Sequence, residues 1–370
     1  MKETPRILIV TAAFGEGHNS AARNMALALD AEGAVCQVSD PILQGAPMTT
    51  AIVSRAYRFV TNRLPWVWHQ IYKSTDRCDF TKRQLPVLRY PEKAFGRMID
   101  QFKPDAIVST YPLYPYFLRR IRQGINGSVP MITVVTDSIE INASWLRAPC
   151  DHWLVTDAKT RERMDPPVPV DKITATGFPV HPRFASQDTL AEDDACSPFR
   201  ILYFATTNPH MLSSQGCALL DVSSEVRLTI VMGRNVRKLV RRAKALQQAY
   251  PGRVRLIGWT RRVPKLLAHH HLVVGKAGGA TVHEAIAARC PMLIHHLVPG
   301  QEEGNLQLLE SIGGGALANA PRLLKGKVTG LLANDAGGWR EMKRGLIRHN
   351  RSDGSQVAAR FVLDYIKATQ

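Results

Sequence analysis

Long apolar runs are missing from this sequence of 370 residues. No stretch approaches the roughly 18 uncharged apolar residues that a membrane-spanning helix needs. The opening segment, MKETPRILIVTAAFG, lacks the charged head, long apolar core and small-residue cleavage site of a secretory signal, and instead predicts a buried first strand. Six cysteines are scattered without a C-x-x-C pair, which favours reduced cytoplasmic thiols over disulfides or a zinc site.

Several short motifs are also absent. The chain contains no Asp-x-Asp motif, which argues against a diphosphate held through manganese. It has no Walker lysine–serine pair, so phosphate transfer on a P-loop is disfavoured. No helix-turn-helix, zinc-finger or RNP pattern is present. We therefore expect no metal, no resident cofactor and no nucleic-acid partner.

Acidic residues are scarce in one part of a strongly basic chain. Lys and Arg number 48 against 31 Asp and Glu, a formal net charge of +17. Residues 226–283 hold thirteen of these cations and no acid. Such a surface attracts polyanions, and among them we favour anionic lipid headgroups and nucleotide phosphates over nucleic acid. The alternative explanation of this charge is a soluble protein from a basic proteome, with no polyanionic partner.

Short apolar runs alternate with helical patterns along the chain, which indicates parallel β–α–β units. In the first half we expect a helix at 19–32 and strands at 6–13, 35–40, 105–112, 131–137, 151–157 and 172–179. In the second half we expect strands at 199–206, 226–233, 253–259, 271–279 and 291–297. Helices are expected near 234–250, 262–269, 280–289, 301–312, 338–348 and 355–369.

These elements predict an α/β fold of two Rossmann-like, doubly wound domains that face a cleft, where open sheets bind ligands at the carboxyl ends of their strands. We expect residues 1–185 to form the first domain and residues 186–198 a polar linker. Residues 199–350 would form the second domain. Residues 351–370 would form a C-terminal helix that packs back on the first domain.

Residues 51–73 break the alternation, because aromatic and aliphatic residues are mixed there with basic ones. This composition suits a membrane interface, where an apolar face is immersed and cations meet lipid phosphates. Tyr57, Trp66 and Trp68 are then the expected membrane contacts. A pair of helices packed on the core, with solvated charged faces, fits the composition equally well.

The segment Gly15-Glu16-Gly17-His18 lies between a predicted buried strand and a predicted helix. Gly15 and Gly17 permit a tight turn, and the helix amino end offers N–H groups to an anion or a substrate oxygen. At a helix start the dipole lowers the pKa of His18 and favours the neutral imidazole that a general base needs. A capping or packing histidine is the alternative.

Two further motifs open helices in the second half. In GKAGGATVHEA, at 275–285, small residues allow the backbone to approach a diphosphate, and Glu284 is placed to accept ribose hydroxyls. Alternatively, the Glu284 carboxylate only interacts favourably with the helix dipole and binds no ligand. In PGQEEGN, at 299–305, amide and carboxylate side chains suit a polyhydroxylated ligand, although acids are common in a first helical turn for dipole reasons.

Together these motifs resemble the glycosyltransferase family that contains the peptidoglycan enzyme MurG. The chain is most similar to the branch of monogalactosyldiacylglycerol synthases and processive diacylglycerol glucosyltransferases. The resemblance covers residues 6–320 and is carried by GEGHNSAA (15–22), KPDAIVST (103–110), VVTD (134–137), TGFPV (176–180), GW (258–259), GKAGGATVHEA and PGQEEGN.

The resemblance implies a GT-B architecture and a hexosyltransferase that uses a UDP-hexose and inverts the anomeric carbon by direct displacement. It implies a donor held by the second domain and a lipid acceptor, diacylglycerol or an already glycosylated form, held by the first. It also implies a peripheral protein on the cytoplasmic face of the cell membrane, in contact with its anionic surface.

Individual roles follow from matching positions in the family. His18 is implied as the base or orienting group for the acceptor hydroxyl, with Asp137 as a second base. Trp259 would stack on uracil and Glu284 would hold the ribose. The remaining implied donor contacts are Gly278, Gly279, Ala280 and Thr281 around the diphosphate, and Gln301, Glu302 and Asn305 at the sugar or its phosphate.

The chain departs from the family pattern at two loops. Relatives carry a glycine-rich turn where this chain reads ATTNPH at 205–210, and Pro209 removes a backbone donor there. The following stretch, 211–225, is short for a complete helix plus loop. The family's histidine before the tryptophan is absent from EINASW at 140–145, which bears on acceptor choice.

Two other functions share these features. A UDP-sugar 2-epimerase has the same double-Rossmann architecture, but it needs no lipid surface, so the segment 51–73 argues against it. A nucleotide-sugar or anionic-lipid binding protein without catalysis is the second alternative, and the altered loop at 205–210 is its best support.

Overall fold

The computed structural model describes residues 4–13, 15–76, 88–122, 129–194, 196–300 and 302–369. The chain divides into two compact units. The first unit comprises Met1–Pro182, Val298–Gly304 and Asp353–Gln370. The second comprises Arg183–Leu297 and Asn305–Ser352.

Within the described residues, the first unit is built on a six-stranded parallel sheet in the order β2-β1-β3-β4-β5-β6. Its strands are β1 (Arg6–Val10), β2 (Val35–Ser39), β3 (Ala106–Ser109), β4 (Met131–Val134), β5 (His152–Val155) and β6 (Ile173–Ala175). Its helices are α1 (Glu16–Ala31), α2 (Pro41–Gly45), α3 (Pro47–Arg63), α4 (Pro65–Asp76), α5 (Arg89–Phe102), α6 (Tyr114–Ile121), α7 (Ala143–Leu146), α8 (Ala158–Met164), η2 (Val170–Lys172) and α15 (Gly354–Thr369).

Strand β1 shows why the strands are continuous apolar runs. Parallel strands covered on both faces need apolar residues at every position. Ile7 and Ile9 pack with α1 and α15, whereas Leu8 and Val10 pack on the opposite face with α5 and α6. All four side chains are fully buried. The alternation of β1 side chains therefore contributes to two cores at once.

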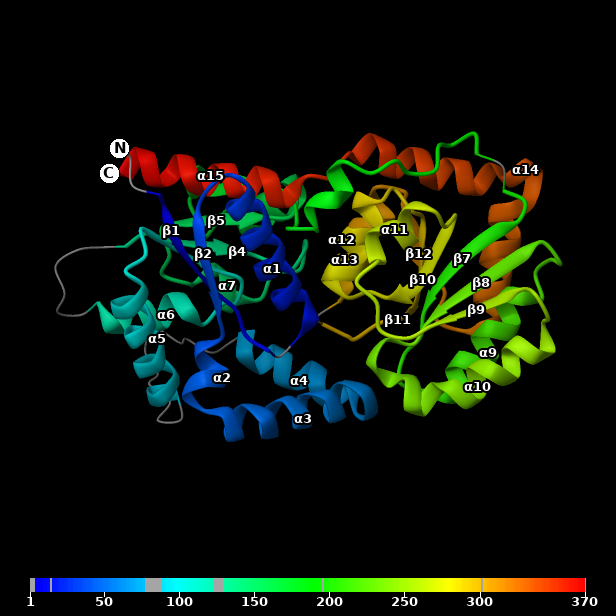
Figure 1. Cartoon of the computed structure of the whole chain (residues 1–370), viewed down its shortest axis with the longest axis horizontal. Helices are drawn as coiled ribbons and strands as arrows, with labels where there is room; N and C mark the ends of the chain where they lie inside the picture. Colours follow the sequence, from blue (N-terminus) through cyan, green and yellow to red (C-terminus); the bar gives the residue numbers. More distant parts are fainter. Residues whose placement is uncertain are drawn as a thin grey trace. The chain divides into compact units, whose positions relative to one another are not determined.

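The C-terminal helix α15 belongs to the first unit (Figure 1, red). Its buried residues, among them Ala358 and Val362, join the core that contains α1. The ring of Phe361 lies 4.5 Å from the ring of His152, between centroids. The helix thus closes one face of the first sheet.

Residues 51–73, for which a membrane-interface segment and a core-packing helix pair fitted the composition equally well, lie in helices α3 and α4. They follow α2 and lie side by side away from the sheet (Figure 1), where α4 also packs against α7. Several large apolar side chains on them are exposed, including Met48, Ile52, Phe59 and Trp66. Among the described residues, no helix is long and apolar enough to span a bilayer.

The second unit repeats the architecture with a six-stranded parallel sheet, described in the order β12-β11-β10-β7-β8-β9. Its strands are β7 (Phe199–Phe204), β8 (Val226–Val231), β9 (Val254–Ile257), β10 (Leu272–Lys276), β11 (Met292–His296) and β12 (Gly315–Leu317). Its helices are η3 (Pro182–Ala185, at the boundary), α9 (Pro209–Leu220), η4 (Gly233–Asn235), α10 (Val236–Ala249), α11 (Val263–Ala268), α12 (Gly279–Ala287), α13 (Glu303–Ser311) and α14 (Pro321–His349).

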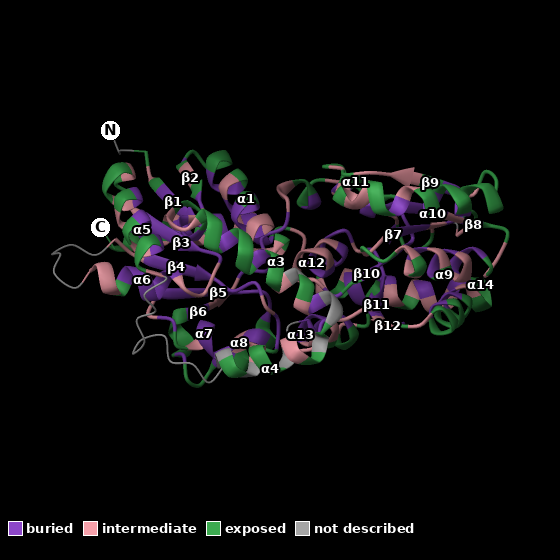
Figure 2. Ribbon diagram, turned by 90° about the horizontal axis from the view of Figure 1, so that it is seen from below, coloured by how far each residue is buried: buried purple, intermediate pink, exposed green. Residues whose placement is uncertain are grey.

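In both units the inner strands are buried, the edge strands β2 and β9 are partly exposed, and the helices are exposed on their outer faces (Figure 2). The second core gathers Leu228 and Ile230 of the sheet, Leu239 of α10, and Leu324 and Trp339 of α14. The indole N–H of Trp339 donates to the backbone oxygen of His271 at 2.6 Å. This bond fixes the second arm of α14 to the sheet.

Several elements differ from expectation, among them helices α5, α6 and α8, for which no residue range was predicted. The stretch after 208 is long enough for a complete helix, because α9 spans Pro209–Leu220 and Pro209 occupies its first turn, where the missing N–H costs little. Strand β12 was not predicted, since it has only three residues. Helix α14 begins well before 338 and is interrupted at Ala333–Ala336, where Asn334, Asp335 and Ala336 are left-handed.

Candidate active site

The first unit places the segment 15–18 at the point where its strand order reverses. Strands β1 and β3 are neighbours, and their crossovers run to opposite sides of the sheet. Open α/β sheets bind ligands at such a switch point, outside the carboxyl ends of the strands. Gly15 and His18 follow β1, and Thr110 follows β3.

His18 is held at this switch point by its ring nitrogen Nδ1. Nδ1 lies 2.8 Å from the backbone oxygen of Thr110 and 3.0 Å from Oγ1 of Thr136. A carbonyl oxygen can only accept, so Nδ1 carries the proton and Nε2 keeps its lone pair. The edge of the His18 ring also meets Tyr111, with centroids 5.2 Å apart.

Burial lowers the pKa of His18 to about 4, while the bond to Thr110 opposes that shift. The cause is desolvation of the charged ring rather than the helix dipole assumed from the sequence. The imidazole is therefore neutral at physiological pH. A neutral ring with Nδ1 protonated is a proton acceptor at Nε2.

Asp137 follows β4 and accepts a hydrogen bond from the indole Nε1 of Trp145 at 2.8 Å. Burial raises the pKa of Asp137 to about 6, and the bond from Trp145 acts in the opposite direction. Trp145 is itself fixed, because its backbone oxygen accepts from Nε1 of Trp153 at 3.0 Å. The carboxylate is ionised at neutral pH and becomes protonated below about pH 6.

His18 and Asp137 line the same cavity, which has a volume of about 540 Å³. Gly15 lies at its edge, and Gly17 is not among its lining residues. A Cβ atom added at Gly17 would meet nothing within 4 Å, so packing within the described chain does not require glycine there.

The rest of the cavity wall is almost entirely apolar and aromatic. Helices α3 and α4 provide Ile52, Val53, Ala56, Tyr57, Val60, Trp68, Ile71 and Tyr72, and the opposite side adds Tyr111, Pro112, Leu113, Asn142, Ser144 and Trp145. Ile52, Val53 and Ile71 are also exposed, by 65%, 45% and 40%. The apolar lining therefore continues from the cavity to the outer surface of the helix pair.

The three residues predicted to contact a membrane are placed differently from one another. Trp66 is 69% exposed. Tyr57 and Trp68 instead line the cavity, with their rings edge to face at 4.8 Å. The indole N–H of Trp68 is buried and has no hydrogen-bond partner among the described residues.

In the second unit the strand order reverses between β7 and β10, so α9 and α12 begin at its switch point. The two helix starts differ in their capping. The side chain of Asn208 accepts from the N–H groups of His210 and Met211, at 3.0 and 3.4 Å. Gly278, at the start of α12, provides no side-chain cap. The first N–H groups of α12, within Gly279, Ala280 and Thr281, are therefore the better anchor for an anion.

Trp259 and Glu284 follow strands of the second sheet at the same carboxyl edge. Trp259 follows β9 and is 54% exposed, with the guanidinium of Arg261 5.4 Å from its ring centre. Glu284 lies half-buried in the second turn of α12. Gln301 is outside the described residues.

Glu302 and Asn305 both make internal contacts. Glu302 is buried, and its carboxylate accepts from the backbone N–H of Val298 at 3.1 Å. The amide nitrogen of Asn305 donates to the backbone oxygen of Ala277 at 3.0 Å, while its side-chain oxygen is buried without a hydrogen-bond partner among the described residues. Asn305 therefore positions the loop that precedes α12.

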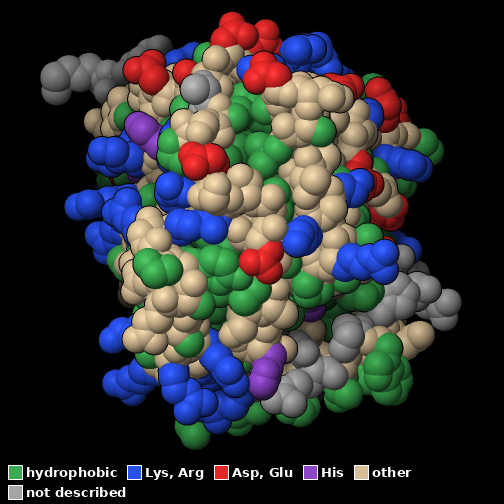
Figure 3. Space-filling view, turned by 90° about the vertical axis from the view of Figure 1, so that its right-hand side faces the viewer, with side chains coloured by type: hydrophobic (Ala, Val, Ile, Leu, Met, Phe, Trp, Pro, Cys, Tyr) green, Lys and Arg blue, Asp and Glu red, His purple; other side chains and the backbone are tan. Residues whose placement is uncertain are grey.

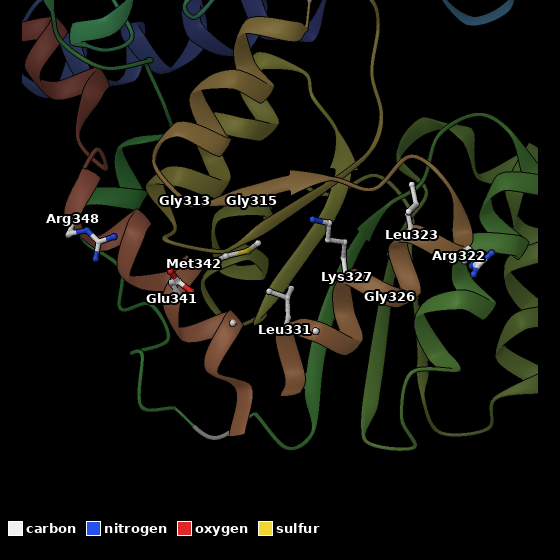
Figure 4. A pocket seen from close by; sticks show the side chains of 12 residues that line it. Gly313, Gly315, Arg322, Leu323, Gly326, Lys327, Leu331, Glu341, Met342 and Arg348 are labelled. Carbon is white, nitrogen blue, oxygen red and sulfur yellow. The ribbon is translucent and has the colours of Figure 1, made fainter. Parts of the chain in front are cut away.

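A separate hollow of about 720 Å³ lies between β12 and the two arms of α14 (Figure 4). Leu331 and Met342 lie between the arms, and Arg322, Lys327 and Arg348 lie around the hollow. None of the predicted donor residues lines it. We therefore assign it no part in donor binding.

Sequence reasoning missed three residues that contact His18 or Asp137 in this cavity. Thr110 is the last residue of the quoted motif KPDAIVST, and Thr136 is the third residue of VVTD, so their places at strand ends were a usable indication. Trp145 was noted only because the residue before it is not the histidine that the family carries there. That it bonds Asp137 depends on how α7 packs, which no local pattern reveals.

The chain is similar to a known protein family and to individual proteins of known activity. The model of the monogalactosyldiacylglycerol (MGDG) synthase family matches residues 18–180. A processive diacylglycerol beta-glucosyltransferase of Bacillus licheniformis is 24% identical over 368 residues, which covers 96% of this chain and 94% of that protein.

Solved structures resemble the whole chain. The crystal structure of Acinetobacter baumannii MurG has a TM-score of 0.60 at 16% identity, covering 97% of this chain and 100% of that one. A UDP-GlcNAc 2-epimerase from Neisseria meningitidis, bound to UDP-GlcNAc, has a TM-score of 0.60 at 12% identity, covering 97% of this chain and 100% of that one. At these identities the likeness establishes the fold alone.

Two parallel six-stranded sheets with flanking helices, matched along their whole length by MurG, define a GT-B protein. With the matches to the synthase model and to the glucosyltransferase, the chain is a glycosyltransferase. It is similar to the family that includes MurG and the diacylglycerol glycosyltransferases.

Proposed function

We propose that the protein transfers a hexose from a UDP-sugar to diacylglycerol, or to an already glycosylated form of it. The single observation that carries the lipid acceptor is the apolar cavity of about 540 Å³ that joins His18 and Asp137 to the exposed helices α3 and α4. An apolar passage ending in two proton-accepting groups suits an acceptor with a hydroxyl head and acyl chains. The relatives' names support diacylglycerol within that class.

The proposed reaction is a direct displacement. The acceptor hydroxyl oxygen forms a bond to the anomeric carbon while the bond from that carbon to the β-phosphate oxygen breaks. The hydroxyl proton passes to Nε2 of His18, and UDP leaves with the electron pair of the broken bond. Attack opposite the leaving group inverts the anomeric carbon.

Asp137 is the second candidate for the base. Its carboxylate is ionised above about pH 6, and it lines the same cavity as His18. Where His18 takes the proton, an ionised Asp137 favours the imidazolium that forms, because opposite charges attract strongly in a site with little water. The pH dependence of kcat/KM separates the contributions of the two groups.

The donor is proposed to bind the second unit at the start of α12. The uncapped N–H groups beyond Gly278 support a diphosphate there, and the exposed ring of Trp259 supports stacking on uracil. Glu284, Gln301 and Glu302 keep their proposed roles at the ribose and the hexose. Charge on departing UDP would be stabilised by the helix dipole and nearby cations, without a metal or other cofactor.

Trp68 is proposed to recognise the polar head of the acceptor. Its indole N–H is buried without a partner among the described residues, and an unpaired buried donor costs about 1–3 kcal/mol. An ester oxygen of diacylglycerol would satisfy it. Trp68→Phe should therefore weaken acceptor use with little effect on UDP affinity, measured as KM for the acceptor and Kd for UDP.

One experiment tests the proposed function directly. The purified chain is incubated with diacylglycerol in vesicles and a panel of UDP-hexoses, and the lipid products and the nucleotide sugars are both analysed. We expect a glycosylated diacylglycerol and released UDP. Interconversion of UDP-sugars without a lipid product would identify an epimerase, and UDP-sugar binding without either product would identify a non-catalytic protein.

The membrane location is part of the same proposal. Exposed apolar side chains of α3 and α4 would enter the lipid interface, which delivers the acceptor to the cavity from within the bilayer. We place the protein peripherally on the cytoplasmic face of the cell membrane. The altered loop at 205–210 supports loss of catalysis less than the sequence indicated, because Pro209 occupies a position where its missing N–H costs little.

A further inference from the structure

Helix α10 of the second unit has one buried face and one strongly basic face. Leu239, Ala243 and Leu246 are buried in the core at a spacing of four and three residues. On the outer side, Arg237, Arg241 and Lys244 form one exposed row, and Lys238 and Arg242 form the adjacent row. Five cations thus cover about two turns of a single helix face.

These charges are not neutralised locally. Among the described residues, no ion pair involves any of the five. The two acids that precede the long acid-free stretch are occupied elsewhere, since Asp221 accepts from Tyr250 and Glu225 accepts from Ser197. Figure 3 shows this end of the second unit, where Lys and Arg side chains gather over α10 at the lower left.

The patch also lacks an apolar component. No large apolar residue of α10 is exposed, in contrast with α3 and α4. A face of this kind attracts a polyanionic surface without inserting into it, and its binding falls steeply as salt rises. The sequence already indicated polyanions, and the structure concentrates that charge on one helix of the unit proposed to hold the donor.

We propose that the outer face of α10 attaches the second unit to an anionic phospholipid membrane. The choice of a membrane rests on the proposed function, because an enzyme whose acceptor is a membrane lipid must work at that surface. Nucleic acid would meet the same charges, but the outer face offers no aromatic side chain on which bases could stack. This attachment is electrostatic and distinct from the apolar contact proposed for α3 and α4.

The test compares two variants of the full chain that lose the same charge. One replaces Arg237, Lys238, Arg241 and Arg242 with Gln. The matched control replaces four exposed cations on α14, namely Arg322, Lys325, Lys327 and Arg348, with Gln. Binding to vesicles of phosphatidylglycerol and phosphatidylcholine is measured by flotation at low salt and at about 0.5 M salt.

We expect the α10 variant to bind these vesicles about 100-fold more weakly than wild type, while the α14 variant changes less than about tenfold. High salt should bring wild type down to the level of the α10 variant. Equal losses in the two variants would overturn the proposal, since net charge alone would then explain binding. Unchanged binding in the α10 variant, or loss of RNA binding with vesicle binding intact, would also overturn it.

A second readout separates this proposal from the proposed function. Transfer to a short-chain diacylglycerol dispersed in water requires no membrane attachment, so the α10 variant should match wild type there and fall behind only on vesicles. Absence of transfer by wild type to any acceptor would remove the proposed function without altering the vesicle-binding result.

Discussion

At the scale of single residues, the site joins a neutral histidine and a carboxylate with opposite pKa shifts. Burial lowers the pKa of His18 and raises that of Asp137, because a buried group of either kind resists carrying charge. Their partners differ: His18 is held by the backbone oxygen of Thr110, and Asp137 by the indole of Trp145. Asp137 can therefore be altered through the side chain of Trp145, whereas His18 is tested by replacing His18 itself.

The pH profile of kcat/KM tests the role of Asp137. If the ionised carboxylate is required, activity falls as the pH drops through about 6, the pKa of Asp137. Trp145→Phe removes the hydrogen bond that favours the ionised form, so this acid limb should move to higher pH. Asp137→Asn should abolish the limb near pH 6. A profile that is the same in wild type and both variants would exclude Asp137 from the reaction.

The residue types at the site were largely readable from the sequence, whereas their contacts were not. GEGH and VVTD mark the ends of buried strands, which is where parallel sheets expose functional side chains. Tyr57 and Trp68 were assigned to a membrane surface because composition does not reveal which face of a helix turns inward. The internal bonds of Glu302 and Asn305 likewise depend on tertiary packing.

At the scale of elements, the helix pair α3–α4 is expected to carry the contact with the bilayer interior. Phe59 and Trp66 are exposed by 59% and 69%, so their replacement by Gln removes apolar surface without disturbing a core. We expect the double variant to lose about tenfold in transfer to vesicle-borne diacylglycerol. Transfer to a short-chain acceptor in water should be unchanged.

A matched control is available on α5. Tyr90 is also 69% exposed, and Tyr90→Gln should leave both activities unchanged. If the α3–α4 variant retained full activity on vesicles, or if it lost activity equally on both acceptors, the helix pair would not be the route by which lipid reaches the cavity.

Helix α14 is fixed to the end of α12 by a buried lysine. Lys343 is 2% exposed, and its Nζ donates to the backbone oxygen of Arg289 at 2.7 Å. Burial lowers the pKa of Lys343 from 10.5 to about 8. Between these values the unfolded chain binds more protons than the folded one, so this residue's contribution to the free energy of unfolding rises with pH.

This pKa shift is tested by the difference in the free energy of unfolding between wild type and Lys343→Met. As the pH rises through the interval between the two pKa values, that difference should shift in favour of wild type by on the order of 2 kcal/mol. Urea unfolding of both proteins at several pH values measures it. Curves that stay parallel would show that Lys343 is charged equally easily in the folded and unfolded chain.

The elements themselves were predictable to differing degrees. Strands such as β1 and β3 are continuous apolar runs, because both faces of a parallel sheet are covered. Strand β12 has too few residues to form a pattern. The interruption of α14 at Ala333–Ala336 follows from left-handed backbone at residues that carry side chains, which a sequence pattern does not predict.

At the scale of the whole molecule, the account predicts a glycosyltransferase that needs no metal. In the proposed mechanism, backbone N–H groups at the start of α12 and cations stabilise the departing UDP, so excess EDTA should change the rate of transfer by less than about twofold. Added Mn²⁺ after EDTA treatment should have no further effect. Loss of transfer in EDTA with recovery on adding Mn²⁺ would contradict the proposed stabilisation of UDP.

The measurement that tests the central claim most directly is single-turnover transfer to diacylglycerol by His18→Ala and His18→Asn. The Asn variant retains a side-chain N–H for Thr110 but has no proton acceptor equivalent to Nε2. The account predicts that both variants lose about 10²–10⁴-fold in rate while the Kd for UDP changes less than about threefold. A transfer rate equal to that of wild type in either variant would show that His18 does not receive the acceptor proton.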